Sequence, residues 1–249
     1  MAAPVGLQLY SVREVIAERG FEPVIREVAE MGYTGVEPAG FPGTTPAEAR
    51  KLFDSLGLAI TSAHLPLPVG DNKAEALDTA GVLGVKRFAA STSRDAFASA
   101  DGLAQLIDTW NEAGQAAAEA GFELGLHNHY WEFDEVDGKP GYEHLIERLD
   151  KGIFFQVDTY WVQTGGGDVN AVVAGLGERA PLLHIKDGPC DPKADMQAVG
   201  DGVMDFPAVI AAAGDVPDWL IVELDRCGTD MMEAVAKSVR YLVDNGLGR

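Results

Sequence analysis

Residues 120–129, Ala120-Gly-Phe-Glu-Leu-Gly-Leu-His-Asn-His129, contain the unit whose repetition decides the fold. A helical stretch from Leu103 to Ala120 ends at Gly121, and the apolar strand after it finishes in polar residues. The same helix-to-strand turn recurs elsewhere in the chain, at Met31-Gly32, Leu56-Gly57 and Leu83-Gly84. Regular alternation of strands with helices is typical of a parallel sheet.

Eight short apolar runs are strand candidates. They are residues 5–10, 35–37, 59–64, 87–90, 123–129, 153–158, 182–185 and 219–224. Helices are expected between them, for example from Pro23 to Met31, from Thr45-Pro46 onward, and from about Asp230 to Asp244. A chain of 249 residues with eight such units predicts an α/β fold, a single (β/α)8 TIM barrel in one domain over residues 1–249. No Gly-x-Gly-x-x-Gly follows the first run, which argues against an open dinucleotide-binding sheet.

The composition narrows the class of protein. The net charge of −20 works against binding to nucleic acid, because an acidic surface repels phosphates. No stretch of about 20 apolar residues predicts a membrane span, and the segment from Met1 to Gly6 does not resemble a signal peptide. The two cysteines, Cys190 and Cys227, do not indicate a disulfide scaffold. We therefore expect a cytoplasmic protein without nucleic-acid or membrane partners, with a homo-oligomer left open.

The fifth strand candidate ends in two histidines. Side chains alternate along a strand, so His127 and His129 share one face. Glu132 comes next in the loop and is placed to fold back over the mouth of the barrel. Active sites of such barrels lie at the carboxyl ends of the strands. We expect this cluster to be functional rather than two surface histidines and a loop acid.

The next three strands each carry a polar group at a comparable level. Asp158 follows an apolar strand, where it could equally cap a helix. His184 is embedded in an apolar strand and is followed by Lys186 on the same face. Glu223 lies inside the last apolar strand, where a carboxylate is costly unless it is paired or binds a metal. Together, Asp158, His184 and Glu223 predict a site for one hard or borderline divalent ion.

The earlier strands supply a second group of polar residues. The candidate substrate contacts are Gln8, Tyr10, Glu37 and His64. The alternative for each is an ordinary polar residue of a loop. From the later strands, His127, Lys186 and Arg226 are predicted to contact substrate as well.

The ordered motifs resemble the xylose isomerase-like barrels grouped as sugar phosphate isomerases/epimerases. The motifs that carry the resemblance are His127-Asn-His-x-x-Glu-Phe133, Val157-Asp-Thr-Tyr-Trp161, Leu183-His-Ile-Lys-Asp187, Gly200-x-Gly-x-x-Asp-Phe206 and Val222-Glu223. They span the second half of the chain, and the first half matches more loosely. The resemblance implies one metal held by Glu, Asp, His and Glu, with Mn²⁺ preferred over Mg²⁺, Zn²⁺ or Co²⁺.

Two positions depart from that family pattern. Many relatives carry the first Glu inside the fifth strand, near the place of Gly125 in this chain. The nearest acid here is Glu132, which is assigned as the fourth ligand beside Asp158, His184 and Glu223, with His127 or His129 as the alternative. Trp161 stands where many relatives have a His that belongs to the multi-zinc site of related apurinic endonucleases, which argues against DNA repair.

The resemblance also implies the reaction. We expect a metal-dependent sugar isomerase or epimerase that transfers a proton next to the carbonyl of a keto-sugar or polyol through an enediolate. The predicted acid/base groups are Glu223 and either Glu132 or His129. A dehydratase or C-glycoside-cleaving lyase acting on keto-inositols or 3-keto-glycosides is the alternative enzyme. A non-catalytic sugar-binding barrel is the alternative from another class. No phosphate cradle is evident, so an unphosphorylated substrate is expected.

Overall fold

Eight parallel strands form one sheet in the computed structural model, which describes residues 2–249. Met1, the first residue of the predicted domain, lies outside the described residues. The strand order is β3-β2-β1-β10-β9-β8-β5-β4. The strands are β1 (Val5–Gln8), β2 (Gly35–Glu37), β3 (Ala59–Ile60), β4 (Arg87–Ser91), β5 (Glu123–His127), β8 (Phe154–Asp158), β9 (Leu182–Ile185) and β10 (Trp219–Val222). A parallel bridge between His64 and Ala89 joins the segment after β3 to β4, the two edges of the sheet.

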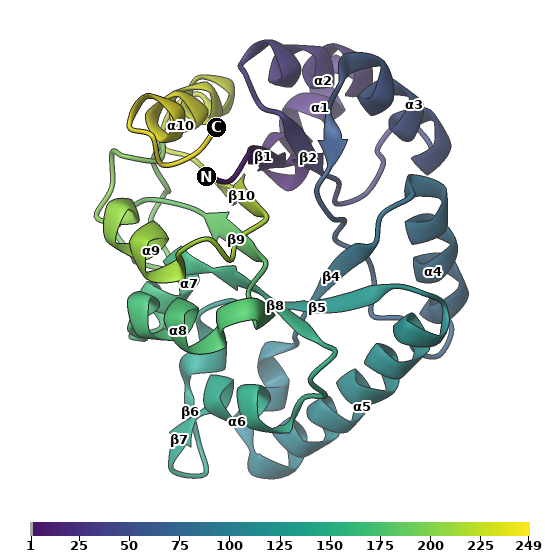
Figure 1. Cartoon of the computed structure of the whole chain (residues 1–249), viewed down its shortest axis with the longest axis vertical. Helices are drawn as coiled ribbons and strands as arrows, with labels where there is room; N and C mark the ends of the chain where they lie inside the picture. The colour runs from purple at the N-terminus through teal and green to yellow at the C-terminus, as the bar shows by residue number, and fades with distance from the viewer. Residues whose placement is uncertain (1) are drawn as a thin grey trace.

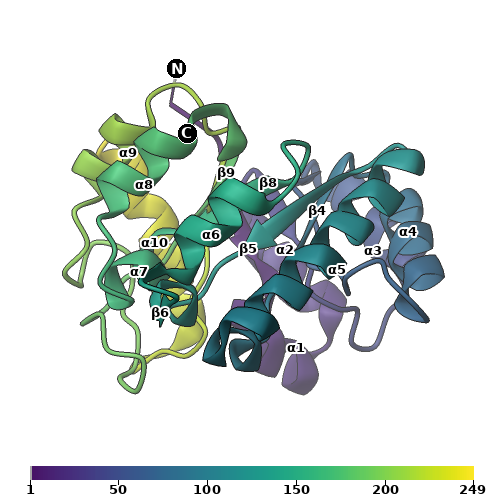
Figure 2. The ribbon, with the colours of Figure 1, turned by 90° about the horizontal axis from the view of Figure 1, so that it is seen from below.

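Helices surround this sheet on the outside (Figures 1 and 2). They are α1 (Arg13–Arg19), α2 (Phe21–Glu30), α3 (Pro46–Leu56), α4 (Asn72–Leu83), α5 (Ala100–Glu119), α6 (Gly141–Arg148), α7 (Thr159–Thr164), α8 (Val169–Leu176), α9 (Phe206–Ala213) and α10 (Met231–Asp244). Short 3-10 turns complete the chain at η1 (Leu9–Val12), η2 (Arg94–Ala98), η3 (Trp131–Phe133) and η4 (Gly177–Arg179). The α/β barrel predicted from the sequence is confirmed, and a strand lies in each of the eight predicted runs. Several strands are shorter than predicted: β1 ends at Gln8 because η1 follows it, and β3 ends at Ile60.

Local sequence signals explain where several helices begin and end. Thr45 caps α3 in a reciprocal capping box with Glu48, and Pro46 occupies the first turn. Gly57 ends the same helix in the left-handed conformation, which glycine adopts without a Cβ penalty. The two ends of the chain lie side by side (Figure 1), since Val5 N–H donates to the carbonyl of Arg249 at 3.1 Å.

The sequence did not predict a two-stranded antiparallel hairpin, formed by β6 (Glu135–Val136) and β7 (Lys139–Pro140). Each strand has two residues, too few for a two-residue period to stand out. No helix within residues 2–249 is long and apolar enough to cross a membrane, and Cys190 and Cys227 are free thiols.

The inside of the barrel has an apolar lower layer. Phe154, Leu182 and Ile221 form a separate buried cluster there. Glycines make room for the large rings, since a Cβ at Gly125 would lie 2.2 Å from the Phe154 ring and one at Gly35 would lie 2.7 Å from the Trp219 ring. Side chains two residues further along a strand point the same way. The inward positions above this layer are therefore those of the polar strand ends.

Candidate metal centre and active site

Five buried side chains meet above the apolar layer of the barrel. Glu37 ends β2, His127 ends β5, Asp158 ends β8, His184 lies within β9, and Glu223 comes directly after β10. Asp158 and His184 are paired in register on neighbouring strands. All five are at most 4% exposed. Parallel pairing and a two-residue period thus bring groups that are far apart in the sequence to one level of the barrel.

Four of them form a group with the geometry of a metal site. The donor atoms of His127, Asp158, His184 and Glu223 all lie within 4.8 Å of one another. Two imidazoles and two carboxylates suit a borderline or hard divalent ion such as Zn²⁺ or Mn²⁺. His127 Nδ1 has no hydrogen-bond partner among the described residues, and Asp158 Oδ2 has none of good geometry, although Lys186 Nζ lies 3.0 Å from it. Buried polar atoms without partners are costly, so the group fits a bound cation.

Asp158 caps a helix, and its position also leaves it free to serve the second role that the sequence suggested, as a metal ligand. Its Oδ1 accepts a 2.9 Å hydrogen bond from the N–H of Trp161 and caps α7, while its Oδ2 faces the site. Burial raises the pKa of Asp158 to about 6, although Lys186 and His184 act in the opposite direction. Capping and metal binding use different oxygens of one carboxylate and do not exclude each other.

His184 lies between two carboxylates. Its Nδ1 is 2.7 Å from Glu223 Oε2, and its Nε2 is 3.1 Å from Glu37 Oε1. Burial lowers the pKa of His184, but the two carboxylates outweigh it and raise the pKa to about 10. Without a metal, the ring is therefore an imidazolium at neutral pH.

Lys186 was predicted to contact substrate, and the structure surrounds it with carboxylates. Its Nζ lies 3.0 Å from Asp158 Oδ2, 2.9 Å from Glu223 Oε2 and 3.0 Å from Asp225 Oδ2. Burial lowers the pKa of Lys186, but these three acids hold it well above its usual value. The ammonium group offsets part of the negative charge of the site, and its predicted contact with substrate stays a prediction.

Glu132 lies outside the four-residue group. Its Oε2 accepts a 2.9 Å hydrogen bond from the N–H of His129, and its Oε1 accepts one from the Thr92 hydroxyl. Burial raises its pKa to about 8, against the effect of the Thr92 hydrogen bond. The side chain starts in η3, beyond the strand end, and both of its carboxylate oxygens are hydrogen-bonded, to Thr92 and to the N–H of His129. The geometry therefore favours His127, the alternative considered from the sequence, as the ligand from this corner.

The position of Gly125 explains why no ligand comes from that point of β5. Gly125 is paired with Phe154 in the apolar layer, whereas His127 is paired with Gln156 one layer higher. A longer side chain at residue 125 would collide with the Phe154 ring. The member of the candidate metal group that comes from β5, His127, therefore lies two residues further along that strand than the Glu of the family pattern.

The sequence marks Glu37 only as a candidate substrate contact, alongside Gln8, Tyr10 and His64. In the structure Glu37 is fully buried and accepts hydrogen bonds from the side chains of three strands and a loop. The signal was present: like Glu223, Glu37 is a carboxylate at the end of an apolar strand and needs partners. Because β2 is only three residues long, that signal was weak.

A cavity of about 380 Å³ opens directly above the group. Six of the residues that line it are Tyr10, His64, His129, Trp161, Glu223 and Arg226. Another cavity of about 380 Å³ lies beside α6 and α8 and is lined mainly by apolar side chains such as Tyr142 and Leu176. The polar cavity is the candidate active site, because it alone of these two is lined by members of the titratable cluster, His127 and Glu223.

Arg226, predicted to bind substrate, holds a neighbouring loop in the structure. Its Nε donates to the carbonyl of Ala194 at 2.9 Å, and its Nη2 donates to the carbonyl of Pro192 at 2.5 Å. Pro192 lines the same cavity. The guanidinium therefore shapes one wall of the cavity, and direct binding of substrate by Arg226 stays a prediction.

Asp187 explains the Gly200-x-Gly-x-x-Asp205-Phe206 motif. Its Oδ2 accepts from the N–H groups of Gly200 at 2.9 Å and Gly202 at 3.1 Å, and its Oδ1 accepts from Gly188 and Met204. Asp205 then caps α9 through the N–H of Ala208. One buried carboxylate thus organises the loop that leads from β9 to α9.

Gly202→Ala is expected to destabilise this loop, because a Cβ at residue 202 would lie 2.0 Å from Asp187 Oδ1 and 2.3 Å from the Gly188 nitrogen. Relieving such an overlap typically costs about 1–3 kcal/mol of unfolding free energy. Denaturant unfolding would measure it. Gly175→Ala in α8 is the control, since nothing lies within 4 Å of a Cβ there. Equal stabilities of both variants would contradict the packing argument.

The chain belongs to the family of xylose isomerase-like TIM barrels, whose sequence model matches residues 25–244. It is 24% identical to the inosose dehydratase of Erwinia tasmaniensis over an alignment of 284 positions, gaps included, that covers 96% of this chain and 95% of that one. It superposes on a sugar phosphate isomerase/epimerase from Parabacteroides distasonis with a TM-score of 0.82 and 25% identity, over 100% and 96% of the two chains. It also superposes on the IolI protein with a bound zinc atom, with a TM-score of 0.69 and 14% identity, over 98% and 97%. The predicted family and the prediction of an enzyme are confirmed.

Proposed function

We propose that the chain is a divalent-metal-dependent enzyme that removes a proton next to the carbonyl of a keto-polyol or keto-sugar and expels the neighbouring hydroxyl as water. The main support is the buried group of His127, Asp158, His184 and Glu223 beneath the polar cavity. Similarity to an inosose dehydratase across almost the whole of both chains favours dehydration. A dehydratase is the alternative enzyme inferred from the sequence.

Mn²⁺ is the proposed ion, with Zn²⁺ as the alternative because two donors are imidazoles. We keep the cytoplasm as the proposed location.

The chain's own residues supply the proton transfer. A divalent ion held by these four side chains would act as a Lewis acid on the carbonyl oxygen. Glu223, which lines the cavity, is the proposed base. As the proton leaves the carbon next to the carbonyl, the electron pair of the broken C–H bond forms a C=C bond to the neighbouring carbon, and the C–O bond of the departing hydroxyl breaks. Glu223 then returns the proton to that hydroxyl, which leaves as water.

Neighbouring groups hold Glu223 and orient the substrate. Burial raises the pKa of Glu223, but Lys186 and His184 outweigh it and hold the pKa far below its usual value, which keeps the carboxylate ionised. His129 also lines the cavity, and burial lowers its pKa to about 3, so the ring is neutral at pH 7. A neutral imidazole both donates and accepts hydrogen bonds, which suits a substrate hydroxyl. Glu132 does not line the cavity. We therefore favour His129 over Glu132 as the group that acts on the substrate together with Glu223.

The cavity suits an uncharged substrate. Its Arg226 is bound to two carbonyls, and the nearby Lys186 is bound to three carboxylates. Glu223 and Asp225 line the cavity and would repel a phosphate group. Tyr10, Tyr130 and Trp161 add aromatic surface on which a polyol ring can rest. We therefore propose an unphosphorylated keto-polyol or keto-sugar.

Isomerisation or epimerisation is the second candidate, because it shares the same first step and because the Parabacteroides neighbour is a sugar phosphate isomerase/epimerase. The two reactions diverge only after the proton has left carbon. In an epimerisation the carbon is reprotonated, whereas in a dehydration the hydroxyl leaves.

Turnover in D₂O separates these reactions. The metal-loaded protein is expected to convert a keto-inositol with loss of one water, seen by mass spectrometry and by near-ultraviolet absorbance of the conjugated product. Formation of a deuterated epimer or isomer without loss of water would instead indicate isomerase chemistry, since exchange into unchanged substrate reports only the proton removal that both reactions share. Chelation should abolish both signals, and phosphorylated ketoses should be turned over more slowly. Full turnover after chelation, or sugar binding without any proton exchange, would refute the proposal.

A further inference from the structure

The Glu37 carboxylate is fully buried, and both of its oxygens accept hydrogen bonds from neighbouring side chains. Five side-chain groups surround it: Gln8 Nε2 at 2.5 Å, His184 Nε2 at 3.1 Å and His64 Nε2 at 3.0 Å around Oε1, with Gln156 Nε2 at 2.6 Å and the Ser62 hydroxyl at Oε2. Glu37 itself belongs to neither group of potential metal ligands found among the described residues. It lies beside the metal site without being a ligand.

The contact between Glu37 and His184 distinguishes the two ring nitrogens. An ionised carboxylate only accepts hydrogen bonds, so Glu37 Oε1 requires a proton on His184 Nε2. The other nitrogen, Nδ1, lies 2.7 Å from Glu223 Oε2, which belongs to the four-residue group. Nδ1 of His184 therefore faces the metal group, while Nε2 is hydrogen-bonded to Glu37.

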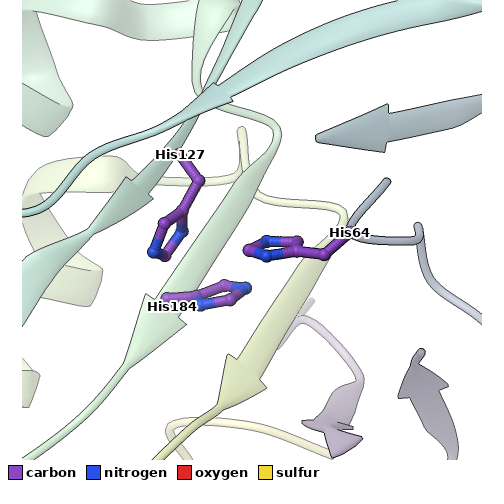
Figure 3. A group of neighbouring side chains, drawn as sticks. All are labelled: His64, His127 and His184. Atoms are coloured by element: carbon purple, nitrogen blue, oxygen red, sulfur yellow. The ribbon is translucent and has the colours of Figure 1, made fainter. Parts of the chain in front are cut away.

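A second contact fixes the plane of the same ring. The His64 ring stacks on His184, with centroids 5.4 Å apart and an angle of 9° between the planes. Figure 3 shows His64, His127 and His184 converging on one point from different elements. His64 Nε2 also contacts Glu37 Oε1 at 3.0 Å and Gln156 Oε1 at 2.5 Å. His184 is thus held along its edge by Glu37 and across its face by His64.

We propose that Glu37 is a positioning residue: it accepts the Nε2 proton of His184 and thereby presents Nδ1 of that ring to the divalent metal ion. Carboxylates that accept the second N–H of a ligating histidine set its tautomer and orientation, and losing them typically weakens metal binding about 10- to 100-fold. The assignment rests on the proposed metal-dependent function. It links the early half of the barrel, through β2, to a ligand on β9, 147 residues later in the chain.

Glu37→Gln tests the assignment, because it keeps the shape of the side chain and removes its charge. We expect the dissociation constant for Mn²⁺ or Zn²⁺, measured by calorimetry, to rise about 10- to 100-fold. Ser62→Ala is the matched control: it removes a donor to the other oxygen of Glu37 and leaves the His184 contact in place. Its dissociation constant should stay within about threefold of wild type, well below the effect of losing the carboxylate.

Nitrogen-15 NMR of the His184 ring supplies a readout that does not depend on activity. In the zinc-loaded wild type, Nε2 should carry the proton and Nδ1 should show the shift of a metal-bound nitrogen. In Glu37→Gln, the Nε2 proton should exchange faster with solvent. A metal-bound Nε2 in the wild type would overturn the assignment, and this wild-type measurement decides the matter should Glu37→Gln fail to fold.

The outcomes separate this inference from the proposed function. Wild-type protein that binds metal tightly, together with Glu37→Gln that binds it equally well, would overturn the role of Glu37 and leave the proposed function standing. Wild-type protein that binds no divalent ion would overturn both.

Discussion

Glu223→Gln is expected to lower turnover about 10²- to 10⁴-fold, the usual contribution of a positioned general base. Glu223 lines the cavity, belongs to the four-residue metal group, and lies 2.7 Å from His184 Nδ1 and 2.9 Å from Lys186 Nζ. The amide is neutral, so it neither takes a proton nor attracts a cation as the carboxylate does. Metal affinity, measured by calorimetry, should therefore fall together with kcat.

Asp225→Asn is the matched control for loss of charge. Asp225 also contacts Lys186, at 3.0 Å, and lines the cavity, but it belongs to neither potential metal group in the described part of the chain. Asp225→Asn should retain metal binding, while Glu223→Gln should not. If Glu223→Gln keeps full turnover and wild-type metal affinity, the assignment of Glu223 as base and ligand is refuted.

Glu132→Gln is expected to make the protein more stable at alkaline pH. Burial raises the pKa of Glu132 to about 8 in the folded chain, while the pKa of a Glu in an unfolded chain is about 4.3. Between these values the folded state holds the extra proton, so stability is lost as pH rises. The loss approaches about 1.4 kcal/mol per pH unit at most. Gln imitates the neutral acid and does not titrate, so its advantage over wild type should grow from about pH 5 to about pH 8.

Unfolding free energies at several pH values measure this effect. Glu135→Gln is the control for losing a carboxylate at the surface, because Glu135 is exposed on the neighbouring β6. An identical pH slope in Glu132→Gln and wild type would show that the buried carboxyl is ionised in the folded protein. Metal affinity provides a second measurement: the geometry favours His127 as the ligand, so Glu132→Gln should still bind the ion.

The strand ends that carry the site could be predicted because burial leaves a clear local pattern. His184 and Glu223 are polar residues in otherwise apolar runs, and Asp158 follows one. In each strand the polar group lies an even number of residues after an apolar residue that points inward: Phe154, Leu182 or Ile221. The period of two then places all three groups on the inner face. Local sequence therefore contained three of the four members of the metal group.

The fourth member could not be chosen from local sequence. His127 and Glu132 lie close together in the chain, and both could reach the barrel mouth. The choice depends on Thr92, which follows β4 and binds the Glu132 carboxylate, and on the register of β5 against β8, which raises His127 above Phe154. Both contacts join distant parts of the chain, and no periodicity within residues 123–133 encodes them.

The sequence by itself determined the barrel, the number of its strands, and the inward direction of Asp158, His184 and Glu223. These follow from hydrophobic periodicity, which each segment carries independently. Tertiary structure alone decided that His127 joins the three others in a candidate metal group, that Lys186 lies among three carboxylates, and that Glu37 reaches His184. The physical reason is that a buried polar group must find partners, and here those partners come from strands that become neighbours only when the sheet curls into a barrel.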